Sequence, residues 1–255
     1  MSSATYRTRV IVLRKTKLGE SDLILTMLAE NGSQIRAVAK GARKPSSPFS
    51  SRLELYSVAD ILLAEGRNLD IVKEAKLDWG NERIRYDVEL AACAASMTEL
   101  LDRITQLGLE NSKLFAMTEA ALVHLDAVDS SKAPAITAAH LLKTMALAGF
   151  RPSLGTCVCC GNAVDVTQSE TVFFSYPEGG VVCSTCITGV ETMRINANVC
   201  AWAEVLLTAT FDGIAAFEID ASTAFSVLQF CQSLIREHVG TNLKSLQFMF
   251  TCGLY

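Results

Sequence analysis

The spacing of hydrophobic residues changes once along this chain, near residue 80, and this change limits the folds open to it. Before that point, short runs alternate apolar and polar side chains, as in Ser33–Lys40, where Ile35 and Ala37 share one face. A period of two is typical of β-strands, whereas apolar residues three or four positions apart are typical of helices. The spacing after residue 80 is helical. The chain therefore predicts a β part followed by a helical part.

The β part has five segments with strand character: Tyr6–Lys17, Asp22–Glu30, Ser33–Lys40, Leu53–Glu65 and Leu69–Asp78. The dipeptide Asn31-Gly32 between the second and third is a strong signal for a tight hairpin. Five short strands in about 75 residues cannot easily cover both faces of an open sheet. We therefore expect a closed or nearly closed barrel over residues 1–80.

The rest of the chain is expected to be mainly helical. Apolar stripes predict helices at about Arg85–Leu107, Leu114–Val128, Pro134–Ala148, Ala197–Phe211 and Ser222–Val239. Asn81 is a candidate N-cap for the first of them. The stripes are most simply a core for one another, and we expect Cys93 and His140, which lie on them, to be packing residues rather than ligands.

Two C-x-x-C pairs interrupt the helical part. The chain has nine cysteines, and four of them form the pairs Cys157/Cys160 and Cys183/Cys186. Two thiolates three residues apart can reach one ion where the chain turns tightly, and two pairs complete a closed tetrahedral shell. We therefore predict one structural Zn²⁺ per chain, in a segment at about 154–189. Cys159 is an alternative ligand to Cys160, and a redox pair or a catalytic zinc site are the alternative interpretations.

Motifs for catalysis and for membrane insertion are missing from the sequence. It contains no P-loop, no G-x-G-x-x-G after a strand, no H-E-x-x-H and no G-x-S-x-G. No apolar run reaches the roughly 18 residues that a membrane span needs, and the N-terminus lacks the apolar region of a secretory signal. We expect a cytoplasmic protein that is not an enzyme and has no membrane partner.

Positive charge is concentrated at the start of the chain. Residues 1–52 carry ten Lys or Arg against three Asp or Glu, whereas residues 53–255 carry 13 against 24. A basic strand face followed by a basic loop rich in Pro and Ser can hold a phosphate backbone against a small barrel, although a solvated edge strand and surface loop is the alternative. The candidate nucleic-acid contacts are Arg14, Lys15, Lys17, Arg36, Lys40, Arg43, Lys44 and Arg52.

Several short motifs occur in an order that resembles the RecO family of bacterial recombination mediators. They are Gly19-Glu20-Ser21-Asp22, Ala39-Lys40-Gly41-Ala42-Arg43-Lys44, Gly149-Phe150-Arg151-Pro152, the two cysteine pairs and Gly180 just before the second pair. The resemblance covers essentially the whole chain. It implies an α+β protein, with an N-terminal five-stranded OB-fold barrel at 1–80 and an all-α helical domain at 81–255 that carries the inserted Cys₄ zinc segment.

The resemblance also implies a function. A protein similar to this family is expected to bind single- and double-stranded DNA, to anneal complementary single strands and to help load RecA onto SSB-coated DNA in recombinational repair, without nucleotide hydrolysis. The implied partners are RecR and the C-terminal tail of SSB, with RecA reached indirectly, and the implied location is the nucleoid. The alternatives are an RNA-binding protein with an OB-fold and zinc, and a protein-interaction scaffold.

Overall fold

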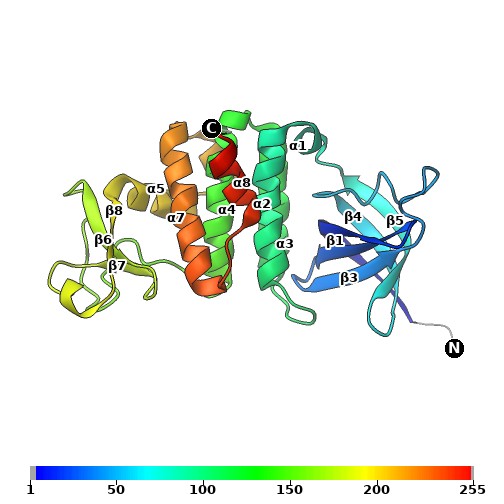
Figure 1. Cartoon of the computed structure of the whole chain (residues 1–255), viewed down its shortest axis with the longest axis horizontal. Coiled ribbons are helices and arrows are strands. Elements are labelled where there is room, and N and C mark those ends of the chain that lie inside the picture. The colour runs from blue at the N-terminus through cyan, green and yellow to red at the C-terminus, as the bar shows by residue number, and fades with distance from the viewer. Residues whose placement is uncertain (1–3, 254–255) are drawn as a thin grey trace. The chain divides into compact units, whose positions relative to one another are not determined.

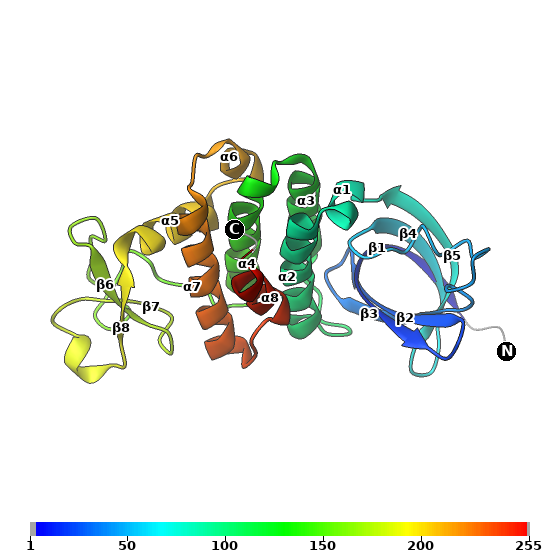
Figure 2. The same ribbon diagram turned by 45° about the horizontal axis from the view of Figure 1, so that its top comes forward.

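Five strands close into a barrel in the computed structural model, which describes residues 4–253 (Figure 1). They are β1 (Thr5–Leu18), β2 (Asp22–Ala29), β3 (Gln34–Ala39), β4 (Val58–Ala64) and β5 (Asp70–Trp79). Their order is β1-β2-β3-β5-β4, and β1 pairs antiparallel with both β2 and β4. A short parallel pairing of β3 with β5 completes the ring seen in Figure 2. This OB-like topology confirms the predicted barrel.

Alternation along the strands fills the interior of the barrel. Val10, Val12, Leu25, Met27 and Ile61 all lie in its buried core. A β-bulge interrupts β1, because Val12 pairs with Met27 and the next paired residue, Arg14, faces Thr26. Such a bulge changes the side to which the following side chains point, and bulges are common at the rims of barrels.

The fourth strand begins at Val58, so its predicted start at Leu53 is wrong. The preceding residues form a turn, in which Ser57 N–H donates to Glu54 O and Tyr56 has a φ of 69°. The apolar residues that resembled a strand instead belong to a loop that packs on the barrel. Leu53 is buried in its core and Phe49 packs against that core.

Three helices follow the barrel: α1 (Glu82–Tyr86), α2 (Val88–Ile104) and α3 (Ser112–Ala127). The predicted capping role of Asn81 is wrong, because its side chain makes no cap and donates instead to the backbone oxygen of Tyr56. Asp87 caps α2, and its carboxylate accepts the N–H groups of Glu89 and Leu90. The first predicted helix is therefore two helices joined at Asp87.

The remaining helices are α4 (Ala133–Leu147), α5 (Ala197–Thr208), α6 (Phe211–Ala216), α7 (Ala221–Val239) and α8 (Lys244–Cys252), with 3₁₀ turns at Ser130–Lys132 and Ile187–Gly189. α4 packs against both α5 and α7 and is buried along almost its whole length. Its His140 is fully buried, and burial lowers the pKa of that imidazole to about 3. Cys93 on α2 is also fully buried, as expected for a packing residue.

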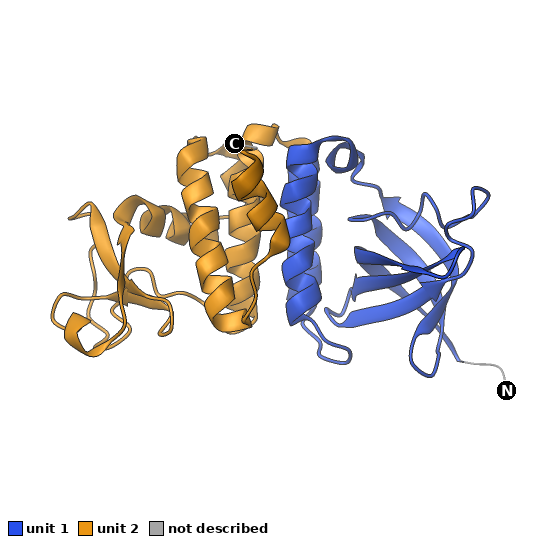
Figure 3. Ribbon diagram, viewed as in Figure 1, with its two compact units in different colours: residues 1–126 blue, residues 127–255 orange. Residues whose placement is uncertain are grey.

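Contacts divide the chain into two compact units, residues 1–126 and residues 127–255, coloured separately in Figure 3. The first unit holds the barrel with α1 and α2, and the second holds α4 to α8 with the cysteine segment. A domain boundary at residue 80 stays a prediction. Among residues 4–253, no helix combines the length and apolar character needed to cross a membrane.

Candidate metal centre and nucleic-acid surface

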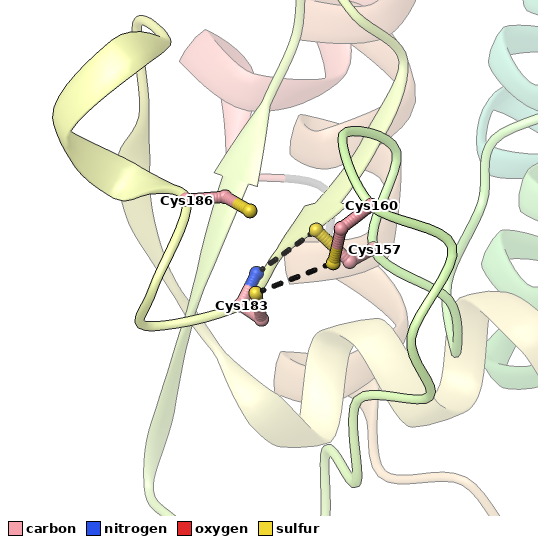
Figure 4. A group of neighbouring side chains, drawn as sticks. All are labelled: Cys157, Cys160, Cys183 and Cys186. Carbon is pink, nitrogen blue, oxygen red and sulfur yellow. Dashed lines mark hydrogen bonds between the residues drawn. The ribbon is translucent and has the colours of Figure 1, made fainter.

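The two cysteine pairs lie on turns that flank a hairpin. The hairpin consists of β6 (Thr171–Ser175) and β7 (Gly180–Val182), and β8 (Met193–Asn196) pairs with the other edge of β6. One pair precedes β6 and the other follows β7. Figure 4 shows their sulfur atoms turned toward a common centre. The hairpin therefore brings together residues that are 23 or more positions apart.

The four sulfur atoms fit one metal ion. Those of Cys157, Cys160, Cys183 and Cys186 all lie within 4.8 Å of one another, and the Cys160 and Cys183 sulfurs are 3.7 Å apart. Tetrahedral Zn–S bonds of about 2.3 Å place sulfur atoms about 3.8 Å from one another. Cys159 is exposed and lies outside this group, so Cys160 completes the cluster.

Hydrogen bonds favour the metal-binding thiolate form at two of the four cysteines, Cys157 and Cys183, whereas hydrogen bonds with the Cys183 and Cys160 sulfurs raise the pKa of the Cys186 thiol. The backbone N–H of Cys183 donates to Cys157 Sγ over 3.3 Å and lowers the pKa of that thiol to about 6. The hydroxyl of Thr185 lies 3.0 Å from Cys183 Sγ and lowers the pKa of that thiol as well. Sequence reasoning missed Thr185, because a threonine between two cysteines carries no signal of this contact.

Gly180 lets the chain pass close to the first cysteine turn. A Cβ at this position would lie 2.4 Å from Val158 Cγ1 and 2.8 Å from Ser153 O. Backbone hydrogen bonds join the two segments next to Gly180, since Val158 N–H donates to Val181 O and Val181 N–H donates to Ser153 O. The first cysteine turn and the strand at Gly180 therefore pack so closely that no side chain fits between them at position 180.

Two of the eight candidate cations form ion pairs within the barrel unit. Arg14 Nε lies 2.9 Å from a carboxylate oxygen of Asp102 on α2, and Lys15 Nζ lies 2.8 Å from Glu54. Asp102 is mostly buried, whereas the side chain of Arg14 is half exposed. The charge of these cations is therefore partly neutralised by the protein itself.

Two more candidates use their guanidinium groups to hold the backbone. Arg43 donates to the carbonyl oxygens of Gly19 and Glu20, which fastens the loop after β3 onto the β1–β2 turn. Arg52 donates to Ala75 O on β5. Both side chains keep their charge, because a carbonyl oxygen does not neutralise it.

The remaining four candidates, Lys17, Arg36, Lys40 and Lys44, are exposed and form no ion pair with any residue between 4 and 253. Gly41 N–H donates to Asp22 over 2.7 Å, which is the main reason that the pKa of Asp22 is lowered, and Lys40 and Lys44 lower it further. The structure thus gathers Lys40, Arg43 and Lys44 beside the β1–β2 turn, and we name these three residues the turn cluster.

Arg36 is placed apart from the turn cluster. It lies opposite Thr26, which in turn lies opposite Arg14, so the two arginines belong to one row across β1, β2 and β3. The candidates therefore form more than one group on the barrel.

Comparison with known proteins gives matches along most of the chain. Residues 1–78 match the family described as Recombination protein O N terminal, and residues 85–247 match Recombination protein O C terminal. A DNA repair protein RecO from Desulfitobacterium hafniense (strain DSM 10664 / DCB-2) is 34% identical over 183 residues, which are 72% of this chain and 65% of that protein. The corresponding protein of Bifidobacterium longum (strain DJO10A) is 39% identical over 70% of this chain and 72% of its own length. That of Alkaliphilus metalliredigens is 33% identical over 76% of each chain.

Proposed function

The chain belongs to the RecO family, and from this premise we propose that it is a DNA-binding mediator of recombinational repair. It anneals complementary single strands and helps load RecA onto SSB-coated DNA, without nucleotide hydrolysis, in the cytoplasm at the nucleoid. The observation that carries the proposal is the turn cluster on an OB-like barrel, which places Lys40, Arg43 and Lys44 together beside one turn.

The mechanism rests on electrostatics. Two DNA strands repel each other through their phosphates, and cationic side chains that displace counterions reduce this repulsion. Lys40 and Lys44 are exposed at the start of the long loop between β3 and β4, where their ammonium groups can follow a phosphate backbone. The interaction of Arg43 with the β1–β2 turn fixes the loop that carries them. The protein would thereby hold one strand while a second strand pairs with it.

The metal in this proposal is structural. The cluster of Cys157, Cys160, Cys183 and Cys186 would hold one Zn²⁺, because its four sulfur donors and their spacing suit that ion. When bound there, the ion would cross-link the two turns. Its four coordination positions would all be filled by sulfur, so none would be open to water. The cysteine turns and Gly180 would then fix the fold of the segment around the hairpin.

The proposed partners are RecR, the C-terminal tail of SSB and, through them, RecA. A cavity of about 460 Å³ between residues 151–156 and α5 supports the second of these, because its lining combines the apolar Leu154 and Val205 with the cationic Arg151. Arg151 is more than half exposed, although Glu204 lies 3.9 Å away. Lys132 and Lys143 are less suitable, because their ammonium groups are already engaged. Lys132 donates to Ala215 O and to the carboxylate of Glu218, and Lys143 donates to the carbonyl oxygens of Leu207 and Ala209.

A strand-annealing assay on SSB-coated complementary strands tests the proposal. We expect the protein to accelerate annealing, and we expect this effect to fall steeply as salt rises, because phosphate contacts displace counterions. A structured RNA competitor that removes the effect more efficiently than single-stranded DNA would favour the RNA-binding alternative. No acceleration at low salt would refute the proposal.

A further inference from the structure

A cavity of about 310 Å³ lies in the barrel unit beside the β-bulge of β1. One wall is a single face of α2, formed by residues three, four and seven positions after Ala95: Thr98, Glu99 and Asp102. The opposite wall consists of Leu13 at the bulge and the Leu55-Tyr56 turn that precedes β4. The volume falls at the lower end of the range for small-molecule sites, which suits a single nucleoside.

Two backbone irregularities meet at this cavity. Leu13 is the residue that the bulge leaves without a cross-strand partner. Tyr56 has a left-handed φ of 69°, which is unfavourable for a bulky residue. Three hydrogen bonds hold it there, because Tyr56 N–H donates to Val12 O, Val12 N–H donates to Ser57 O and Asn81 donates to Tyr56 O. Bulges and strained residues are both concentrated at functional sites.

The cavity combines an apolar floor with charges of both signs. Leu13 and Tyr56 are almost fully buried and provide the apolar side. Arg14, Lys15 and Arg103 provide positive charge. Glu99 and Asp102 provide negative charge, and the mostly buried carboxylate of Asp102 accepts from Arg14. Sequence reasoning missed Arg103, because it lies in the acidic helical part and outside any basic run.

We infer that this cavity holds one unstacked base of a bound single strand, with a preference for cytosine. The inference rests on the proposed DNA-binding function and adds a base-selective contact to it. The base lies against Leu55 and Tyr56, its exocyclic amine donates to Asp102, and Lys15 and Arg103 face the phosphate. A carboxylate accepts from cytosine N4, whereas thymine presents an oxygen at the same position and is repelled.

Titration of the full-length protein with deoxycytidine and thymidine monophosphates tests this assignment. The two nucleotides match in size and charge, and the backbone amides of α2 and of residues 54–56 report binding through NMR chemical shifts at constant ionic strength. We expect dCMP to bind about tenfold more tightly than dTMP. Asp102→Asn should abolish this preference, because the amide can donate to thymine and still accept from Arg14. Ala95→Leu should abolish binding of both nucleotides, because it fills the cavity without changing a charge.

Asp60→Asn is the matched control, because it removes one negative charge, as Asp102→Asn does, from a position on β4 outside the cavity. It should keep the preference for dCMP. Equal or absent binding of the two nucleotides, in a protein that still binds a single-stranded oligonucleotide, would overturn the base site and leave the proposed function standing. Absence of oligonucleotide binding as well would overturn both.

Discussion

Gly180 is the residue whose replacement the structure tolerates least around the metal cluster. A Cβ added here would clash with Val158 and Ser153, and both of these residues are fixed by backbone hydrogen bonds. Relief of the clash would require the cysteine turn to move away from β7. Since Val158 lies next to Cys157, such a movement changes the separation of the four sulfurs.

Gly180→Ala should therefore lower the free energy of unfolding by about 2 kcal/mol, the usual cost of an overpacked site. It should also speed the loss of bound zinc to a chromophoric chelator. Gly155→Ala is the control, because a Cβ there meets nothing within 4 Å. Unfolding of both variants at the same urea concentration, with equal rates of metal release, would show that no close contact at Gly180 stabilises the segment.

Among the elements of the fold, we expect the segment from the first cysteine turn to β8 to need a bound metal for its stability. Its three strands have five, three and four residues, and a sheet of this size buries little apolar surface. Phe174 is its one fully buried large side chain among the residues described, and Tyr176 and Phe230 pack around it. Small modules of this kind are commonly stabilised by a structural metal.

Cys186→Ser should abolish stoichiometric zinc binding and remove hydrogen-exchange protection from β6 and β7, while β1 to β5 stay protected. Cys159→Ser should keep one zinc per chain, because that thiol lies outside the cluster. Metal content by mass spectrometry of the native protein and exchange rates provide the measurements. Full zinc content in Cys186→Ser, or loss of zinc in Cys159→Ser, would disprove the proposed ligand set.

The sequence predicted those elements whose pattern is local. Alternation located β1, β2, β3 and β5, and the C-x-x-C spacing located the cysteine cluster. The alternation gave a wrong start for the fourth strand at Leu53, because apolar residues in a loop that covers a barrel can alternate as they do in a strand. It also could not place Arg14, whose partner Asp102 is 88 positions away and whose orientation depends on a bulge. Long-range pairing and backbone irregularity leave no periodic signal.

Charge is distributed unevenly over the protein, and this distribution affects where a polyanion can bind. The net charge is −4, yet residues 1–52 hold ten of the 23 cationic side chains and three of the 27 acidic ones. These cations strengthen the binding of DNA to the barrel, whereas the excess of acidic side chains in residues 53–255 weakens DNA binding elsewhere on the protein. We therefore predict that a few exposed lysines on the barrel, rather than the net charge, determine DNA affinity.

The most direct test is the salt dependence of single-stranded DNA binding by the double variant Lys40→Ala/Lys44→Ala. Each phosphate contact contributes about 0.7 to the slope of log affinity against log salt, so we expect the slope to be smaller by about 1.4 in this variant. The control Lys73→Ala/Lys76→Ala removes the same charge from β5, outside the candidate contacts, and should leave the slope unchanged. An unchanged slope in the first variant, or an equal fall in both, would contradict the account.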